Sequence, residues 1–98
     1  MNKKVSFHEL AEFELNDAAV FFETKREGLG SRFLLAVEAA VAYIREHPEA
    51  SPLIIQDIRR KVLRKFPYSI LYSIKSDRIR ILAIANQRRR PFYWQDRK

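Results

Sequence analysis

The sequence contains no cysteine and only two glycines, Gly28 and Gly30. Without cysteine the chain can form no disulfide framework, no thiolate-ligated metal site and no cysteine nucleophile. Two glycines are too few for a glycine-rich phosphate-binding loop. No apolar run approaches the length of a membrane-spanning helix, and no apolar stretch follows the two lysines near the amino terminus. These absences predict a cytoplasmic protein that has neither a signal peptide nor a membrane segment.

Residue combinations typical of metal or nucleophilic catalysis are also missing. The two histidines, His8 and His47, lie far apart and have no cysteine with which to share a metal, so we interpret each as a capping or surface residue. Ser69 and Ser73 have no histidine nearby in the sequence. We therefore expect no metal and no cofactor.

Positive charge is abundant but unevenly distributed. The net charge is +7, yet residues 1–56 contain 6 Lys/Arg and 9 Asp/Glu, whereas residues 57–98 contain 13 Lys/Arg and 3 Asp/Glu. The first part therefore carries −3 and the second +10. Such segregation indicates an acidic or nucleic-acid partner for the second part. The alternative is a solvated basic surface that only maintains solubility.

Two amphipathic helices are predicted in the first half of the chain. Apolar residues recur at spacings of three and four residues, as on one face of a helix. The two stripes are Ala11, Leu15, Ala18 and Phe22, and then Phe33, Val37, Ala40 and Ile44. Gly28 is expected to close the first helix, Ser31 to cap the second, and His47-Pro48 to end it. The short connection predicts an antiparallel helical hairpin.

The second half favours β-structure. Ile58–Leu63 is β-capable, Tyr68–Ile74 alternates with a period of two, and Ile79–Ala85 is almost entirely apolar, as in a strand covered on both faces. With a first strand at Lys4–His8, the expected order is β-α-α-β-β-β. We predict a single α+β domain over residues 1–98, a helical hairpin packed on a small, mostly antiparallel sheet. The position of the first strand in the sheet stays open.

Basic residues follow two of the expected strands. In an antiparallel meander the ends of the second and fourth strands lie at the same edge of the sheet, so Arg64-Lys65 should converge with Arg88–Arg90. Clustered guanidinium groups bind phosphate, and aromatic rings stack on unpaired bases. The predicted target-binding residues are Arg64, Lys65, Arg89, Arg90 and Trp94. Alternatively, Phe92 and Trp94 close the core.

Four strings, in this order, resemble the RelE/ParE superfamily of toxins from type II toxin–antitoxin systems, and in particular its plasmid stabilisation branch. They are ELNDAAVFFE (Glu14–Glu23), GLGSRFL (Gly28–Leu34), IRRKVLRKFPYSILYSI (Ile58–Ile74) and ILAIANQRRRPFYWQDR (Ile81–Arg97). The resemblance implies a small toxin that a cognate antitoxin wraps and neutralises. RelE-like members cleave mRNA on the ribosome, whereas ParE-like members poison DNA gyrase and are not known as hydrolases.

The ribonuclease residues of the superfamily carry over only in part. Arg60 matches a basic residue of the second strand, Arg88 an arginine after the last strand, and Tyr93 a tyrosine near the end. These three would be catalytic if the protein were a ribonuclease.

Three positions depart from the ribonuclease pattern. Val62 replaces a lysine, Ser69 an arginine, and Asn86 a histidine that is usual in related chains. Each lost contact to the transition state is worth roughly 2–4 kcal/mol of barrier. We therefore expect gyrase inhibition, with an RNA-cleaving toxin or an inactive binding relative as alternatives, so whether the chain is an enzyme stays open.

An antitoxin-binding surface is expected on the first helix. Phe13, Val20 and Phe21 fall outside its main apolar stripe and should be exposed. An antitoxin segment that offers apolar anchors and carboxylates would fit this helix and the basic sheet. The sequence does not determine the stoichiometry or any self-association.

Overall fold

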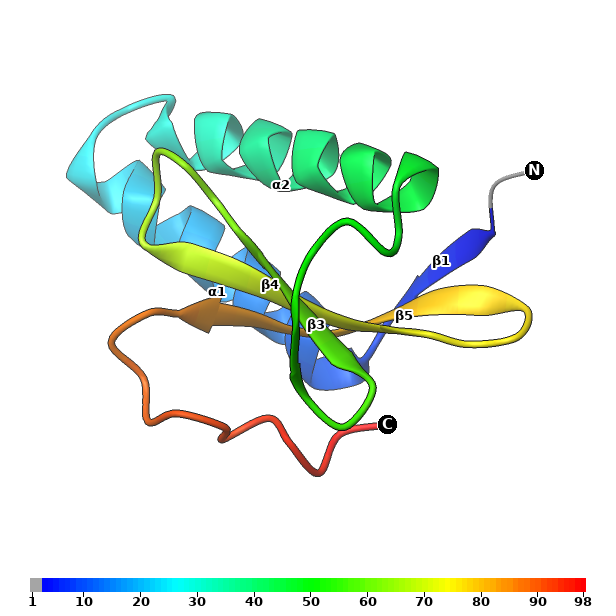
Figure 1. Cartoon of the computed structure of the whole chain (residues 1–98). Coiled ribbons are helices and arrows are strands. Elements are labelled where there is room, and N and C mark those ends of the chain that lie inside the picture. Colours follow the sequence, from blue (N-terminus) through cyan, green and yellow to red (C-terminus); the bar gives the residue numbers. More distant parts are fainter. Residues whose placement is uncertain (1–2) are drawn as a thin grey trace.

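The protein is described by a computed structural model over residues 3–98, and its fold belongs to the predicted α+β class. Two helices cover one face of a five-stranded sheet of order β1-β5-β4-β3-β2, as Figure 1 shows. The elements are β1 (Lys4–Phe7), α1 (Glu9–Lys25), α2 (Leu29–Glu46), β2 (Leu53–Ile55), β3 (Ile58–Val62), β4 (Tyr68–Ile74) and β5 (Arg78–Asn86). No helix within residues 3–98 has the length and apolar character needed to cross a membrane.

The predicted meander is confirmed, but the predicted order β-α-α-β-β-β lacks one strand. β3, β4 and β5 pair antiparallel in succession, whereas the short β2 pairs with the start of β3 through Leu53 and Arg59. The sequence analysis missed β2 because three apolar residues give no periodic signal. β1 lies at the other edge, parallel to β5, with Lys4 opposite Arg78. The sheet is therefore mixed: β1 and β5 pair parallel, and all the other neighbouring strands pair antiparallel.

The turn between the helices differs in detail from the prediction. Gly28 is the N-cap of α2 with φ +86°, and Ser31 lies inside the helix, so the prediction that Ser31 caps it was wrong. The side chain of Glu23, which lies on α1, caps the start of α2 instead. Its two carboxylate oxygens accept hydrogen bonds from the Gly28 and Gly30 N–H groups, both at 2.9 Å. These bonds satisfy amides that a helix leaves free at its start.

The histidines lie at helix ends, as predicted. His8 is the N-cap of α1, and its Nδ1 accepts a hydrogen bond from the Leu10 N–H at 3.0 Å. Burial lowers the pKa of His8, and the positive charges of Arg97 and Arg80 add to this effect. His47 is the C-cap of α2. The lowered pKa favours the neutral imidazole, the form in which Nδ1 can accept.

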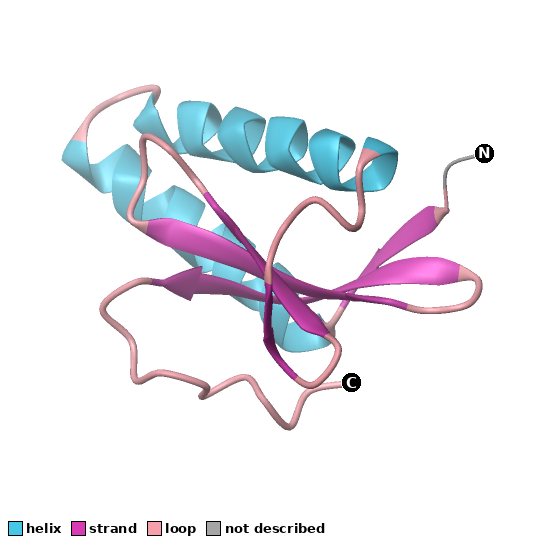
Figure 2. Cartoon of the chain, viewed as in Figure 1, coloured by secondary structure: helices cyan, strands magenta, loops and turns pink. Residues whose placement is uncertain are grey.

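Apolar clusters lie on both faces of the sheet. The helical hairpin and the inner face of the sheet bury one core around Phe33, Ile44, Tyr72 and Ile81. The opposite face buries a smaller cluster formed by Ile58, Leu71, Leu82, Ala83, Ala85 and Trp94. Trp94 comes from residues 87–98, called the tail below, which contain no helix or strand (Figure 2). Coverage of both faces explains the continuous apolar run of β5.

The side chain of Glu14, on α1, fixes the tail to the folded body. Its carboxylate accepts two hydrogen bonds from the Arg97 guanidinium at 2.9 and 3.0 Å, one from the Tyr93 hydroxyl at 2.8 Å and one from the Ile84 N–H at 3.0 Å. The Glu14 and Arg97 side chains are each only 12% exposed. A bidentate ion pair whose carboxylate oxygens also accept hydrogen bonds from other donors remains favourable when it is buried.

Substitution of Gly30 by alanine should destabilise the protein. A Cβ at this position would lie 2.5 Å from the Ala19 carbonyl oxygen of α1, so the helices would have to separate. We expect a loss of about 1–3 kcal/mol in the free energy of unfolding, measured by urea denaturation. Ser31→Ala, at an exposed position one residue further along α2, is the control and should stay within about 0.5 kcal/mol of the parent. A Gly30→Ala protein of unchanged stability would contradict this account of the hairpin.

Substitution of Glu14 by alanine should free the tail and lower stability by about 3 kcal/mol, because a partly buried guanidinium and a tyrosine hydroxyl lose their acceptor. Hydrogen exchange should accelerate most strongly at the tail amides and at the Ile84 N–H. Glu12→Ala, on the exposed side of the same helix, serves as the control. Equal tail protection in the two variants would show that Glu14 does not hold the tail.

Candidate functional site

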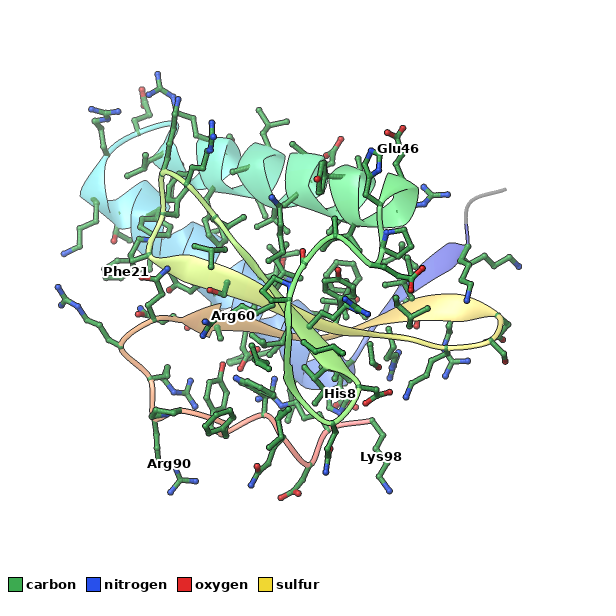
Figure 3. The ribbon with its side chains drawn as sticks, viewed as in Figure 1. His8, Phe21, Glu46, Arg60, Arg90 and Lys98 are labelled. Carbon is green, nitrogen blue, oxygen red and sulfur yellow. The ribbon has the colours of Figure 1, made fainter. Side chains whose placement is uncertain are left out.

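A hollow of about 260 Å³ lies between the outer face of the sheet and the tail. Its walls bring together side chains from four strands, β2 to β5, and from the tail. Its lining includes Arg60 from β3, Ser69 and Leu71 from β4, Asn86 from β5, and the tail residues Arg89, Arg90, Phe92, Tyr93 and Trp94. Figure 3 labels Arg60 on the sheet and Arg90 on the tail. We call this hollow the arginine hollow.

The structure brings together only part of the predicted basic cluster. The ends of β3 and β5 do share one edge, since Val62 pairs with Ser69 and Tyr68 with Asn86. Arg64 and Lys65, however, line a different hollow, against α2. The chain leaves β3 through Leu63, which is buried in the core on the helical side, so the next residues follow α2. The predicted convergence of Arg64-Lys65 with Arg88–Arg90 was therefore wrong.

Three arginines of the arginine hollow lack carboxylate partners. Among residues 3–98, Arg60, Arg89 and Arg90 take part in no ion pair. The Arg89 guanidinium carbon lies 4.0 Å from the centre of the Tyr93 ring, a cation–π contact that holds this side chain at the site. Arg88 is exposed and does not line the hollow, and its N–H donates to the Asn86 side-chain oxygen at 2.9 Å. The available charge therefore comes from both the sheet and the tail.

The two outer aromatic residues of the tail have different surroundings. Trp94 is only 5% exposed and belongs to the outer core cluster, as the core-closing alternative predicted. The same alternative was wrong for Phe92, which is 44% exposed and packs its ring edge-on against Trp94 at 5.7 Å. The φ of Phe92 is +63°, an uncommon value for a bulky residue. The tail thus holds one aromatic side chain outward and one inward.

The Tyr93 hydroxyl is committed to Glu14. It donates a hydrogen bond to Oε2 of Glu14 at 2.8 Å, and the residue is partly buried. Burial, this hydrogen bond and the carboxylate charge raise the pKa of Tyr93 well above its usual range, and the opposing effects of Arg89 and Arg97 are smaller. Tyr93 therefore keeps its proton at neutral pH and cannot accept another group's proton there.

Glu14 and Arg97 shape the site, although neither was among the predicted site residues. Glu14 lies three residues after Ala11 and four before Ala18, so it interrupts the buried stripe of α1. A carboxylate on a buried helical face needs a cationic or hydrogen-bonding partner. That rule could have identified Glu14 from the sequence, but it could not have identified Arg97 among the many arginines of the second half.

The predicted antitoxin-binding residues are exposed, as expected. Phe13, Val20 and Phe21 on α1 are 65%, 64% and 49% exposed, and Leu10 at 47% extends the same stripe. Taken in chain order from Leu10 to Phe21, these four residues are three, seven and one positions apart, which places them on one side of the helix. Exposed apolar side chains gathered in this way are typical of a protein-binding surface.

The family described as "ParE toxin of type II toxin-antitoxin system, parDE" matches residues 5–91. A solved structure titled "Chromosomal ParDE TA system from P. aeruginosa" aligns with a TM-score of 0.63 and 18% sequence identity, over 86% of this chain and 95% of that chain. No curated protein matches.

These matches agree with the resemblance inferred from the four sequence strings. The solved structure shares the fold of this chain. The family match spans most of the sequence, including all seven helices and strands except the first residue of β1. The chain belongs to the ParE toxin family of type II toxin–antitoxin systems.

Proposed function

We propose that this toxin inhibits DNA gyrase through the arginine hollow, which acts as a docking surface and not as a catalytic site. The observation that carries the proposal is the 2.8 Å hydrogen bond from the Tyr93 hydroxyl to Glu14. Loss of the hydroxyl proton would place a phenolate beside a carboxylate, and like charges at this distance strongly oppose ionisation. A tyrosine held in this way suits a binding surface better than proton transfer.

The surroundings of Tyr93 also argue against RNA cleavage. Ser69 and Asn86 line the arginine hollow at positions where the ribonuclease pattern has cationic or basic side chains. Arg88, the third member of the expected catalytic set, lies outside it. Only Arg60 and Tyr93 of that set face the same space, and this shared position is the observation that favours the ribonuclease alternative. An inactive binding relative is the third candidate.

A docking role needs only a rigid surface of suitable charge and shape. Arg60, Arg89 and Arg90 supply positive charge without internal partners, and Phe92 supplies an exposed ring. Gyrase works on DNA, so its complex presents dense negative charge from phosphates. Arginine and exposed aromatic side chains are the groups that most often dominate the binding energy of an interface. We propose that the toxin acts in the cytoplasm.

We further propose that the antitoxin neutralises the toxin by binding the apolar stripe of α1 formed by Phe13, Val20 and Phe21. Side chains at these spacings fit the groove or helix of a partner, as in helix-in-groove recognition. Loss of the antitoxin would leave the toxin free to inhibit growth, which would stabilise a plasmid that encodes both proteins.

Reversal of charge in the arginine hollow should weaken gyrase inhibition. The doubly substituted Arg89→Glu, Arg90→Glu toxin should need at least about tenfold more protein for half-inhibition of supercoiling, equivalent to about 1.4 kcal/mol. Tyr93→Phe should inhibit as well as the parent, because Glu14 retains Arg97. Arg26→Glu with Arg32→Glu, two exposed positions near the helical turn, is the matched control. Equal loss in the control would point to overall charge and not to the hollow.

An assay of mRNA cleavage on programmed ribosomes tests the ribonuclease alternative directly. The proposal expects no cleavage of mRNA within codons by the purified toxin. Cleavage that disappears on Tyr93→Phe or Arg88→Ala would replace gyrase inhibition by the ribonuclease alternative. Inactivity in both assays by folded protein would favour the inactive binding relative.

Truncation of the α1 stripe should weaken the antitoxin complex. Phe13→Ala and Phe21→Ala should each cost about 2 kcal/mol of binding, or roughly thirtyfold in Kd, without loss of toxin stability, because both rings are exposed. Isothermal titration with the cognate antitoxin measures the first effect and urea denaturation the second. Leu35→Ala, at a 63% exposed position on α2, is the control. Unchanged affinity in both phenylalanine variants would remove this surface from the proposal.

A further inference from the structure

Phe92 holds its aromatic ring outward on a backbone conformation that is unfavourable for it. Its φ of +63° lies in the left-handed region, which a bulky side chain adopts only where the surrounding structure enforces it. Glycine or asparagine would fit this position with less strain. Strained residues of this kind cluster at binding and catalytic sites. The presence of a large ring here indicates a role for the ring itself, since folding alone would favour a smaller residue.

The tail fixes the direction of this ring before any partner binds. The Gln95 N–H donates a hydrogen bond to the Phe92 carbonyl at 3.0 Å, which closes a turn after the residue. Pro91, immediately before it, has a fixed φ. The buried indole of Trp94 supports the ring, with the two ring centres 5.7 Å apart. A ring held in this way loses little conformational freedom on binding, so more of its contact energy stabilises the complex.

The exposed part of the arginine hollow combines this ring with cations. Of the residues that line the hollow, six are exposed: Arg60, Gln87, Arg89, Arg90, Pro91 and Phe92. They offer one aromatic ring among three guanidinium groups, none of which forms an ion pair within residues 3–98. A protein-binding surface gathers several apolar anchors instead, as the α1 stripe does. A ring flanked by cations is the arrangement that proteins use to stack on a base and hold the neighbouring phosphates.

Arg89 can bind a phosphate while it stays in contact with Tyr93. Its guanidinium carbon lies 4.0 Å from the centre of the Tyr93 ring. A guanidinium that stacks on a ring uses its face, so the N–H groups, which lie in its plane, can still donate to an anion. Arg90 on the tail and Arg60 on β3 bring two further charges to the same hollow. The phosphates beside a base stacked on Phe92 would therefore meet several donors.

From these features, and resting on the proposed inhibition of gyrase, we infer that the arginine hollow binds a strand of the DNA that gyrase holds. The Phe92 ring stacks on an unpaired or terminal base, and the arginines bind the phosphates beside it. Gyrase cuts and rejoins DNA, so its complex contains strand ends whose last base has one free face. The ring then contacts the nucleic acid and not an apolar socket of the enzyme. Every base offers such a face, so we expect little preference for sequence.

The first test titrates the full-length toxin alone with a short single-stranded DNA that carries 2-aminopurine, a base whose fluorescence changes when a ring stacks on it. Phe92→Trp keeps a stacking ring and should bind as tightly as the parent. Phe92→Leu keeps apolar bulk but cannot stack, so it should weaken binding about tenfold and remove the fluorescence change. Tyr43→Leu, which removes a ring of equal 44% exposure from α2, is the matched control and should leave binding unchanged.

Gyrase supercoiling assays with the same variants separate base stacking from the choice of target. Phe92→Leu should need about tenfold more toxin for half-inhibition, whereas Phe92→Trp should match the parent. A parent toxin that leaves gyrase active would overturn the proposed function, and the titration would still decide whether Phe92 stacks on a base.

Phe92→Gly deletes the ring without added backbone strain, because glycine suits a φ of +63°, so it provides a second measure should Phe92→Leu misfold. A well-dispersed nuclear magnetic resonance spectrum checks that each variant is folded. Two results would overturn the inference: DNA binding by folded Phe92→Leu and Phe92→Gly that equals the parent, or gyrase inhibition that Phe92→Leu retains in full. The second result would place the ring in an apolar socket of the enzyme.

Discussion

The ion pair between Glu14 and Arg97 is the interaction on which the outer half of the structure depends. It joins the first helix to the tail, and the same carboxylate also holds Tyr93 and the Ile84 N–H of β5. Without this carboxylate the tail would keep the packing of Trp94 and a few hydrogen bonds, such as those from the Arg97 guanidinium to the Leu82 carbonyl and from the Gln87 N–H to the Pro67 carbonyl. The same partly buried glutamate anchors one wall of the arginine hollow through Tyr93, and it adds to the burial that raises the pKa of that tyrosine.

The positions of the α1 stripe and the arginine hollow divide the surface of a small domain between two regions. The apolar stripe lies on α1, whereas the arginine hollow lies under the tail. The split in charge between the two halves of the sequence thus becomes a split in space, because the sheet faces and edges carry most of the cations. An antitoxin anchored on α1 must therefore also reach across the tail to cover the arginine hollow.

Periodic residues were predictable, and residues whose role depends on a distant partner were not. The stripes around Ala11 and Phe33 predicted both helices, and alternation around Ile70 predicted β4. β2 was not predicted because three residues are too few to show a periodic pattern. The positions of Arg64 and Lys65 were not predicted because they depend on the direction that the chain takes after the buried Leu63. Glu14 could have been suspected from its place on a buried face. Its pairing with Arg97 depends on the tertiary structure, since nothing in the local sequence distinguishes that arginine from the other arginines nearby.

The parallel pairing of β1 with β5 has a consequence for how the protein folds. Ser6 and Arg80 are neighbours although 74 residues separate them, and Glu14 and Arg97 are separated by 83. Contacts between such distant parts of a chain form late, because the loop between them must first lose its conformational freedom. The helical hairpin, whose contacts are local, can form earlier. A newly made chain would therefore display α1 before the arginine hollow exists, so a partner that binds α1 can meet the chain before the tail is in place.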